Sequence, residues 1–192
     1  VVAKMSKSLK NVVNPDEEIK LYGADSVRMY EMFMGPLTMS KPWATQGIVG
    51  IHRFLEKVWA VSEKPLNDID ITGKIDDKAL ASLRKTFAQT VKKVSADTDS
   101  LNFNTAISAV MELVNELYRY KELDDVNMGL MRCAAETVVL LLAPFVPHIA
   151  EEMWEGLGFC ESLYFHSWPK ADESALVLDT VEIVDASYVD GP

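Results

Sequence analysis

The chain has few of the residues that stabilise small secreted domains or build metal centres. Its 192 residues include two cysteines and three histidines. Cys133 and Cys160 stand alone, without a Cys-x-x-Cys pair, and the histidines have no metal-ligand spacing. We therefore expect reduced thiols in a cytoplasmic protein, structural roles for the histidines, and no bound metal.

Long apolar runs are also missing. The longest, residues 137–146, is too short to cross a bilayer and contains Pro144. The apolar start, Val1-Val2-Ala3, has no hydrophobic region behind it and does not resemble a secretory signal. It reads as the end of a strand, so we expect a fragment of a longer protein with no membrane partner.

An excess of positive charge is lacking as well. The formal net charge is −10, and from Glu161 onward acidic residues outnumber basic ones seven to one. The basic residues of the preceding part are clustered, and a local cationic stripe is enough to follow a phosphate backbone. Composition therefore neither supports nor excludes an RNA partner.

The most distinctive segment that is present lies near the N-terminus. Lys4, Lys7 and Lys10 fall within seven residues, and no acidic residue precedes Asp16. Between the lysines lie Ser6 and Ser8, whose small hydroxyl side chains favour a loop and donate hydrogen bonds. The pattern predicts a mobile cationic loop that closes on phosphate.

Helical patterns occupy most of the remaining chain. Asn14 and Pro15, followed by three acids, predict a helix start, and Gly23 predicts its end. We expect Asp25 or Ser26 to cap a second helix over 27–34. Apolar residues three and four apart predict further helices at about 46–63, 76–96, 104–121 and 127–142, the last of which is apolar almost all round and therefore central.

The predicted fold is mainly α: four or five packed helices behind a short loop-helix segment. Pro144 and Pro147 predict a break, after which the last helix resumes to Gly156 or Gly158. The aromatic segment 162–169 is expected to be extended and to pack back on the bundle. Alternation over 181–184 predicts one strand.

The loop and the segments after it resemble class I aminoacyl-tRNA synthetases of the valyl, isoleucyl and leucyl group. The resemblance begins at Lys4-Met5-Ser6-Lys7-Ser8 and continues, in the family's order, through residues 11–15, 22–25, 28–30, 103–107 and 144–154. Similarity to the bacterial leucyl branch is strongest at residues 32–37, 43, 53–55, 167–169 and 172–173. One departure is Leu9-Lys10, where many relatives have Lys-Gly, and the missing glycine removes some loop freedom.

The resemblance implies a ligase that uses ATP, with Mg²⁺, to activate leucine as leucyl-adenylate and then transfers leucine to tRNA(Leu). Lys4 and Lys7 would stabilise the charge that develops on the leaving pyrophosphate, Lys7 most directly. Ser6 and Ser8 would support the loop and bind ATP phosphates. The family's His-x-Gly-His motif, nucleotide-binding sheet and editing domain are not in this sequence. We therefore expect a chain that is inactive alone and binds no ATP tightly. We also expect it to be a monomer.

The resemblance also divides the chain. Residues 1–40 would be the end of a catalytic domain, with the lysine loop and stem-contact helices. Residues 41–160 would be a helical anticodon-binding bundle, and residues 161–192 an extended segment leading to a further domain. Since leucyl enzymes generally do not read the anticodon, the bundle is expected to contact the tRNA core and stems.

The expected phosphate contacts of the bundle are basic residues on its polar helix faces: Arg53, Lys57, Arg84, Lys85, Lys92, Lys93 and Arg119. An ordinary solvated helix face is the alternative for each of them. Two other interpretations of the whole chain remain open. One is the same region of a valyl, isoleucyl or methionyl synthetase. The other is a non-catalytic helical RNA-binding module, which would not account for the lysine loop.

Overall fold

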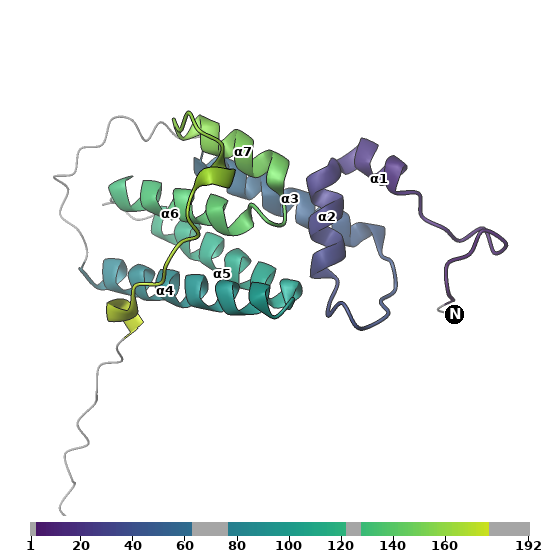
Figure 1. The fold of residues 1–192 in the computed structure, drawn as a ribbon, viewed down its shortest axis with the longest axis horizontal. Helices are drawn as coiled ribbons and strands as arrows, with labels where there is room; N and C mark the ends of the chain where they lie inside the picture. The colour runs from purple at the N-terminus through teal and green to yellow at the C-terminus, as the bar shows by residue number, and fades with distance from the viewer. Residues whose placement is uncertain (1–2, 63–76, 122–127, 177–192) are drawn as a thin grey trace, which may run out of the picture.

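The computed structural model describes residues 3–62, 77–121 and 128–176, and these form helices without a strand (Figure 1). The helices in order are α1 (Pro15–Tyr22), α2 (Ala24–Phe33), α3 (Thr45–Ser62), α4 (Asp77–Asp99), α5 (Phe103–Lys121), α6 (Met128–Leu142) and α7 (Pro147–Gly156). Two 3-10 turns follow, η1 (Leu163–Phe165) and η2 (Glu173–Leu176). The mainly α prediction is confirmed, whereas the strand expected at 181–184 lies outside the described residues.

Local capping shapes the α1–α2 hairpin. The Asn14 side chain accepts a hydrogen bond from the Asp16 amide at 3.2 Å, and Pro15 occupies the first helical position. Gly23 ends α1 with φ of +83°, a conformation that favours glycine. These features were predicted. The prediction that Asp25 or Ser26 caps its own helix is wrong, because α2 begins at Ala24 with Gly23 at the N-cap position and no side-chain cap.

The bundle consists of α3 to α7 around one apolar core. Eight of the fifteen residues of α6 are buried, as expected for the central helix. Helix α6 ends at Leu142 and α7 begins at Pro147, which confirms the predicted break. Phe145, in the turn between them, is 1% exposed and packs edge-on against Phe103 of α5. The α6–α7 turn is therefore part of the core.

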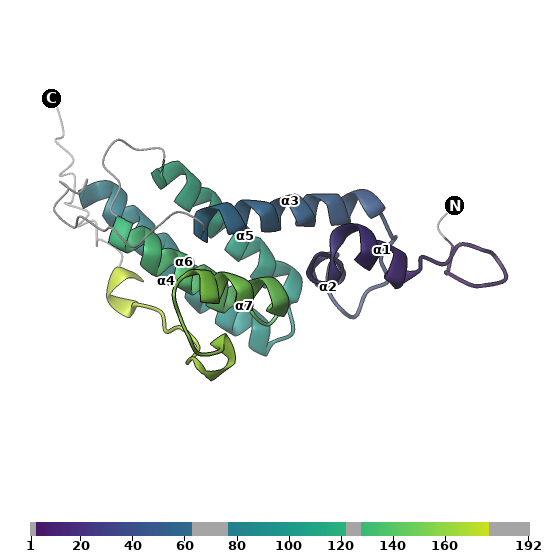
Figure 2. The same cartoon turned by 90° about the horizontal axis from the view of Figure 1, so that it is seen from above.

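The α1–α2 hairpin lies at one end of the bundle (Figures 1 and 2). Met29 of α2 is fully buried, and Tyr30 is 5% exposed. The Tyr30 hydroxyl donates to the Ala44 carbonyl at 2.9 Å and accepts from the Ala44 amide at 3.0 Å. A Cβ atom at Gly47 would lie 2.3 Å from the Tyr30 ring, so glycine is what lets α3 approach α2 this closely.

The C-terminal segment packs back on the bundle, as predicted. The Trp168 indole donates to the Ser95 hydroxyl at 2.8 Å, and η2 lies beside α4. Leu163 is buried next to α7, where the Glu151 carboxylate accepts from the Ser162 hydroxyl at 2.6 Å and the Leu163 amide at 3.0 Å. The segment 162–169 is not wholly extended, because η1 interrupts it.

A pH prediction follows from these bonds to Glu151. The Ser162 hydroxyl, followed by the Leu163 amide, holds the pKa of the Glu151 carboxyl below its ordinary value. The bonds therefore stabilise the fold at neutral pH, and this contribution is lost as the pH falls through the lowered pKa. In an NMR titration, Ser162→Ala should move the midpoint of Glu151 upward. A midpoint that Ser162→Ala leaves in place would contradict the assignment.

Candidate functional site

The lysine loop is closed on itself by the side chain of Asn11. Its carbonyl oxygen accepts from the Ser6 amide at 2.8 Å, and its amide group donates to the Lys4 carbonyl at 3.3 Å. The Ser6 hydroxyl accepts from the Leu9 amide at 3.2 Å and lies 3.1 Å from the Ser8 hydroxyl. Local hydrogen bonds thus give the loop a defined shape without help from the bundle.

The ammonium groups of the loop are available to a ligand. Lys4, Lys7 and Lys10 are exposed, and none of them has an ion pair or a side-chain hydrogen bond among the described residues. The loop lies beyond α1, on the side away from the bundle, in both views (Figures 1 and 2). Positive charge is therefore presented outward, where phosphate can reach it.

The backbone of the loop is left-handed at Lys10, whose φ is +51°. The Lys10 amide donates to the Lys7 carbonyl at 3.2 Å, which makes this conformation part of the turn. Residues other than glycine adopt a left-handed backbone conformation at a cost of about 1–2 kcal/mol. Lys10, where the resemblance leads us to expect glycine, thus has a backbone conformation that favours glycine.

A surface hollow of about 570 Å³ lies where α2, α3 and α7 meet. Tyr22, Leu55 and Trp59 form much of its wall, and two histidines line it. His52 Nδ1 lies 3.2 Å from the Ser26 hydroxyl, and His148 Nδ1 lies 2.8 Å from Asp25 Oδ1.

Each histidine contacts a neighbouring element, and the structural role expected for the three of them stays a prediction. The His166 ring packs edge-on against Trp154 at 4.6 Å. Within the described residues, no three histidine, cysteine or acidic side chains are grouped so that they could hold a metal ion.

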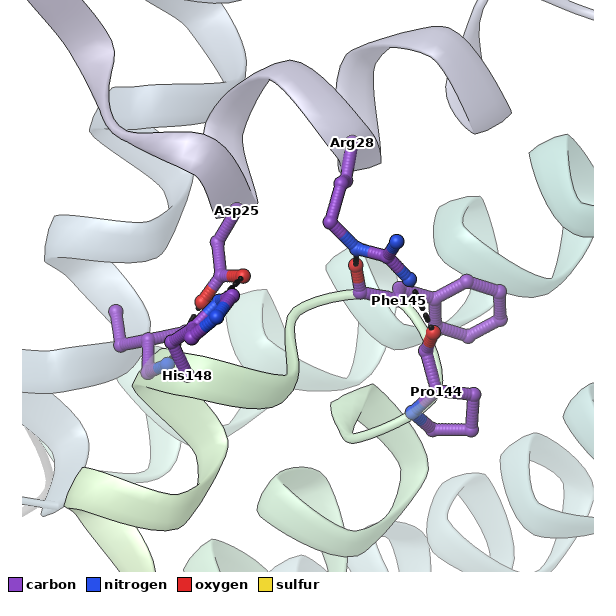
Figure 3. Close-up of polar contacts among 6 residues, drawn as sticks. Asp25, Arg28, Pro144, Phe145 and His148 are labelled. Atoms are coloured by element: carbon purple, nitrogen blue, oxygen red, sulfur yellow. Dashed lines mark hydrogen bonds and ion pairs between the residues drawn. The ribbon is translucent and has the colours of Figure 1, made fainter. Parts of the chain in front are cut away.

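Two polar residues of α2 form hydrogen bonds with the α6–α7 turn and with the first residues of α7 (Figure 3). The Asp25 carboxylate accepts from the Ile149 amide at 2.7 Å, in addition to its contact with His148. One turn farther along, the Arg28 guanidinium donates to the Phe145 carbonyl at 3.4 Å and the Pro144 carbonyl at 3.3 Å. We refer to Asp25 and Arg28 with these partners as the α2 clamp. Sequence analysis did not identify it.

The structure distributes the seven candidate cations of the bundle over α3, α4 and α5, and five of them have partners. Arg84 pairs with Asp172 at 3.1 Å and Lys92 with Glu173 at 3.2 Å, so two carboxylates, one just before η2 and one at its start, neutralise both cations. The remaining partners are Asp97 for Lys93 at 2.8 Å, Asn115 for Lys57 at 2.7 Å, and Glu116 for Arg119.

Among the described residues, only Arg53 and Lys85 of the set have no ion pair or hydrogen bond.

Two pKa values reflect this pairing. The Ser174 hydroxyl, with a smaller contribution from Arg84, holds the pKa of the Asp172 carboxyl below its ordinary value. Burial tends to raise the pKa of Asp97, but hydrogen bonds from Lys93 and Thr105 outweigh it and lower the value. Both carboxylates are therefore charged at neutral pH and reduce the positive field around α4.

A protein-family model described as the anticodon-binding domain of tRNA ligase matches residues 81–188. The chain is 50% identical over 185 residues to the leucine--tRNA ligase of Borreliella burgdorferi (strain ZS7) and 47% identical to that of Borrelia turicatae (strain 91E135). Each match covers 96% of this chain and 20% of the relative, so the chain spans about a fifth of the length of these relatives.

A solved structure is similar over most of the fold. It is the LeuRS of Agrobacterium radiobacter K84 in a ternary complex with tRNA and LeuAMS. The TM-score is 0.81 at 28% identity, and the match covers 91% of this chain and 23% of that one. No helix in the described part of our chain is long and apolar enough to span a membrane.

The strained turn leads to a prediction about Lys10. Lys10→Gly should stabilise the closed loop by about 1 kcal/mol, because glycine adopts the positive φ without steric cost. Amide hydrogen exchange at Ser6 and Leu9, whose amides are bonded inside the loop, should slow about fivefold. Asn11→Ala, which removes the closing side chain, should instead speed it. Equal exchange in Lys10→Gly and the parent chain would count against the strain.

Proposed function

Since the chain belongs to the tRNA ligase family that this anticodon-binding domain defines, we propose that it is part of a leucine–tRNA ligase. Such an enzyme uses ATP to activate leucine as leucyl-adenylate and passes the leucyl group to tRNA(Leu). The observation that carries the proposal is similarity to leucine--tRNA ligases at 50% identity over 96% of the chain, because it extends over nearly the whole sequence.

In this proposal Lys4 and Lys7 act on the phosphates of ATP. Adenylate formation moves negative charge onto the leaving pyrophosphate, and mobile ammonium groups stabilise that charge most strongly in the transition state. The exposure of both lysines and the absence of partners among the described residues support this role. Ser6 and Ser8 keep the loop closed through their mutual contact, and a remaining hydroxyl hydrogen is free to bind a phosphate oxygen.

The donor groups of the loop suit phosphate rather than metal. Residues 3–13 contain lysine, serine and asparagine side chains but no carboxylate, the ligand that Mg²⁺ prefers. We expect a magnesium ion to be bound by the ATP phosphates and by residues outside this loop.

The same proposal assigns a role to each part of the chain. Residues 1–40 carry the loop and the hairpin next to the tRNA stem, and residues 41–160 bind tRNA(Leu) through its backbone. Residues 161–192 connect the bundle to a further domain. The enzyme is proposed to act as a cytoplasmic monomer. Arg53 and Lys85 are the strongest candidates for phosphate contacts, since neither has an ion pair or a hydrogen bond from its side chain among the described residues.

Removal of one ammonium group tests the proposed chemistry. In the full-length ligase, Lys7→Ala should lower kcat for ATP–pyrophosphate exchange by about 10²-fold or more, because a donor to the developing charge is lost. Its affinity for tRNA(Leu) should stay within about twofold, since the bundle is unchanged. Lys20→Ala, which removes an exposed lysine from α1, is the matched control. Normal exchange by Lys7→Ala, or an equal loss in Lys20→Ala, would refute the role.

The pairing of α4 with η2 leads to a prediction about salt dependence. Arg53→Gln/Lys85→Gln should reduce the slope of log affinity for tRNA(Leu) against log salt by about 1 to 2, because up to two phosphate contacts are lost. Arg84→Gln/Lys92→Gln should leave the slope unchanged, since Asp172 and Glu173 already neutralise those cations. Binding of tRNA(Leu) to the full-length ligase at several salt concentrations measures both. The reverse order of effects would contradict the assignment.

A further inference from the structure

The α6–α7 turn has polar groups that its own residues do not satisfy. Helix α7 begins with Val146 at the N-cap position, which supplies no side-chain hydrogen bond, and with Pro147, which has no amide hydrogen. On the other side, the carbonyl groups of Pro144 and Phe145 follow the end of α6 and face away from its ladder. Because Phe145 and Val146 are buried, the backbone polar groups of these two residues would be costly to leave without partners.

The α2 clamp satisfies both sides with charges of the matching sign. The Asp25 carboxylate caps the positive N-terminal end of α7 through the Ile149 amide, and the Arg28 guanidinium binds the negative carbonyl groups beyond α6. Residues 25 and 28 are three apart, so they lie on one face of α2. Asp25 is 8% exposed, which shields its hydrogen bonds from water.

The clamp adds direction to a contact made largely by apolar side chains, in which Ser26 and Tyr30 supply the polar contacts to α3 and to the residue before it. Val27, Met29 and Tyr30 bury α2 against the bundle, and burial of this kind is nearly independent of angle. Two charge-assisted contacts to opposite sides of one turn fix the rotation of α2 as well as its position. Helix α1 leads into α2 through the Gly23 junction and packs on α2, with a smaller contact to α3 through Tyr22, and the lysine loop is joined to α1.

We propose that Asp25 and Arg28 are positioning residues that set the orientation of the α1–α2 hairpin, and with it the lysine loop, on the bundle. The eight residues of α1 span about 12 Å, so a rotation of α2 by about 5° displaces the far end of α1 by about 1 Å. Misplacement of a catalytic group by 1 Å costs up to about 10²-fold in rate. The consequence for catalysis rests on the function proposed above, whereas the orientation itself does not.

Distance measurements on the 192-residue chain test the orientation. Spin labels at exposed Leu21 in α1 and exposed Gln89 in α4 report the angle of the hairpin, in a Cys133→Ser/Cys160→Ser background. Arg28→Met, which keeps the length of an exposed side chain but removes its donors, should broaden the distance distribution, and Asp25→Asn should do so too. The matched control is Glu151→Gln, which weakens a carboxylate contact of the same helix α7 without touching α2.

Kinetics of the full-length ligase test the consequence. Arg28→Met should lower kcat for ATP–pyrophosphate exchange about tenfold, while KM for leucine and for ATP stays within about twofold, because the loop is misplaced and not removed. Glu151→Gln should retain the parent kcat. This split separates a positioning role from a general loss of stability, which would affect both variants.

The outcomes are distinct. Unchanged distance distributions in Arg28→Met and Asp25→Asn overturn the proposal, and so does broadening that Glu151→Gln shows equally. Broadened distributions with an unchanged kcat in Arg28→Met overturn the catalytic consequence. A parent ligase that shows no exchange, or none that depends on Lys7, refutes the proposed function, and the distances then still decide whether the clamp sets the hairpin angle.

Discussion

The interruption between α6 and α7 is the constraint on which the arrangement of the molecule depends. Two prolines stop the helical ladder at the edge of the core, so amide and carbonyl groups lose their helical partners next to the buried residues Phe145 and Val146. An element from elsewhere in the chain has to supply those partners. Helix α2 does so with Asp25 and Arg28, and in this way a local defect in the bundle becomes the attachment point for the N-terminal hairpin.

Local features of the fold could be predicted because their causes are local. Asn14 caps α1 by accepting from an amide two residues away, and Gly23 ends that helix through its own φ. Both effects can therefore be predicted from a short stretch of sequence. The role of Asp25 was not visible in this way. In sequence an aspartate at the start of a helix reads as that helix's own cap, whereas its partner Ile149 lies 124 positions later. The signal that the sequence offered was that residues 22–25 and 144–154 both belong to the same family resemblance.

The positions of basic residues on a helix face were similarly predictable. Whether those residues are free to bind a ligand or are paired with carboxylates was not. Periodicity correctly places Arg84 and Lys92 on a polar side of α4. It does not show that Asp172 and Glu173 lie against them, because that depends on how the C-terminal segment returns along the bundle. Exposed ion pairs of this kind contribute little stability, about 0–1 kcal/mol each. Their larger effect is to cancel a field that would otherwise attract polyanions.

The lysine loop combines a local shape with a distant anchor. Asn11 and the two serines give it its turn, and Lys10 accepts a left-handed backbone to complete that turn. None of these contacts ties the loop to the bundle, so its shape and its position have separate physical causes. The loop is positioned through α1, which is linked to α2 at Gly23 and also contacts α3 where Tyr22 packs edge-on against His52. If the loop delivers ammonium groups to one place, as proposed, a rigid joint at α2 serves that role, and the charged contacts of Asp25 and Arg28 at the break in the bundle would provide it without adding residues near the loop.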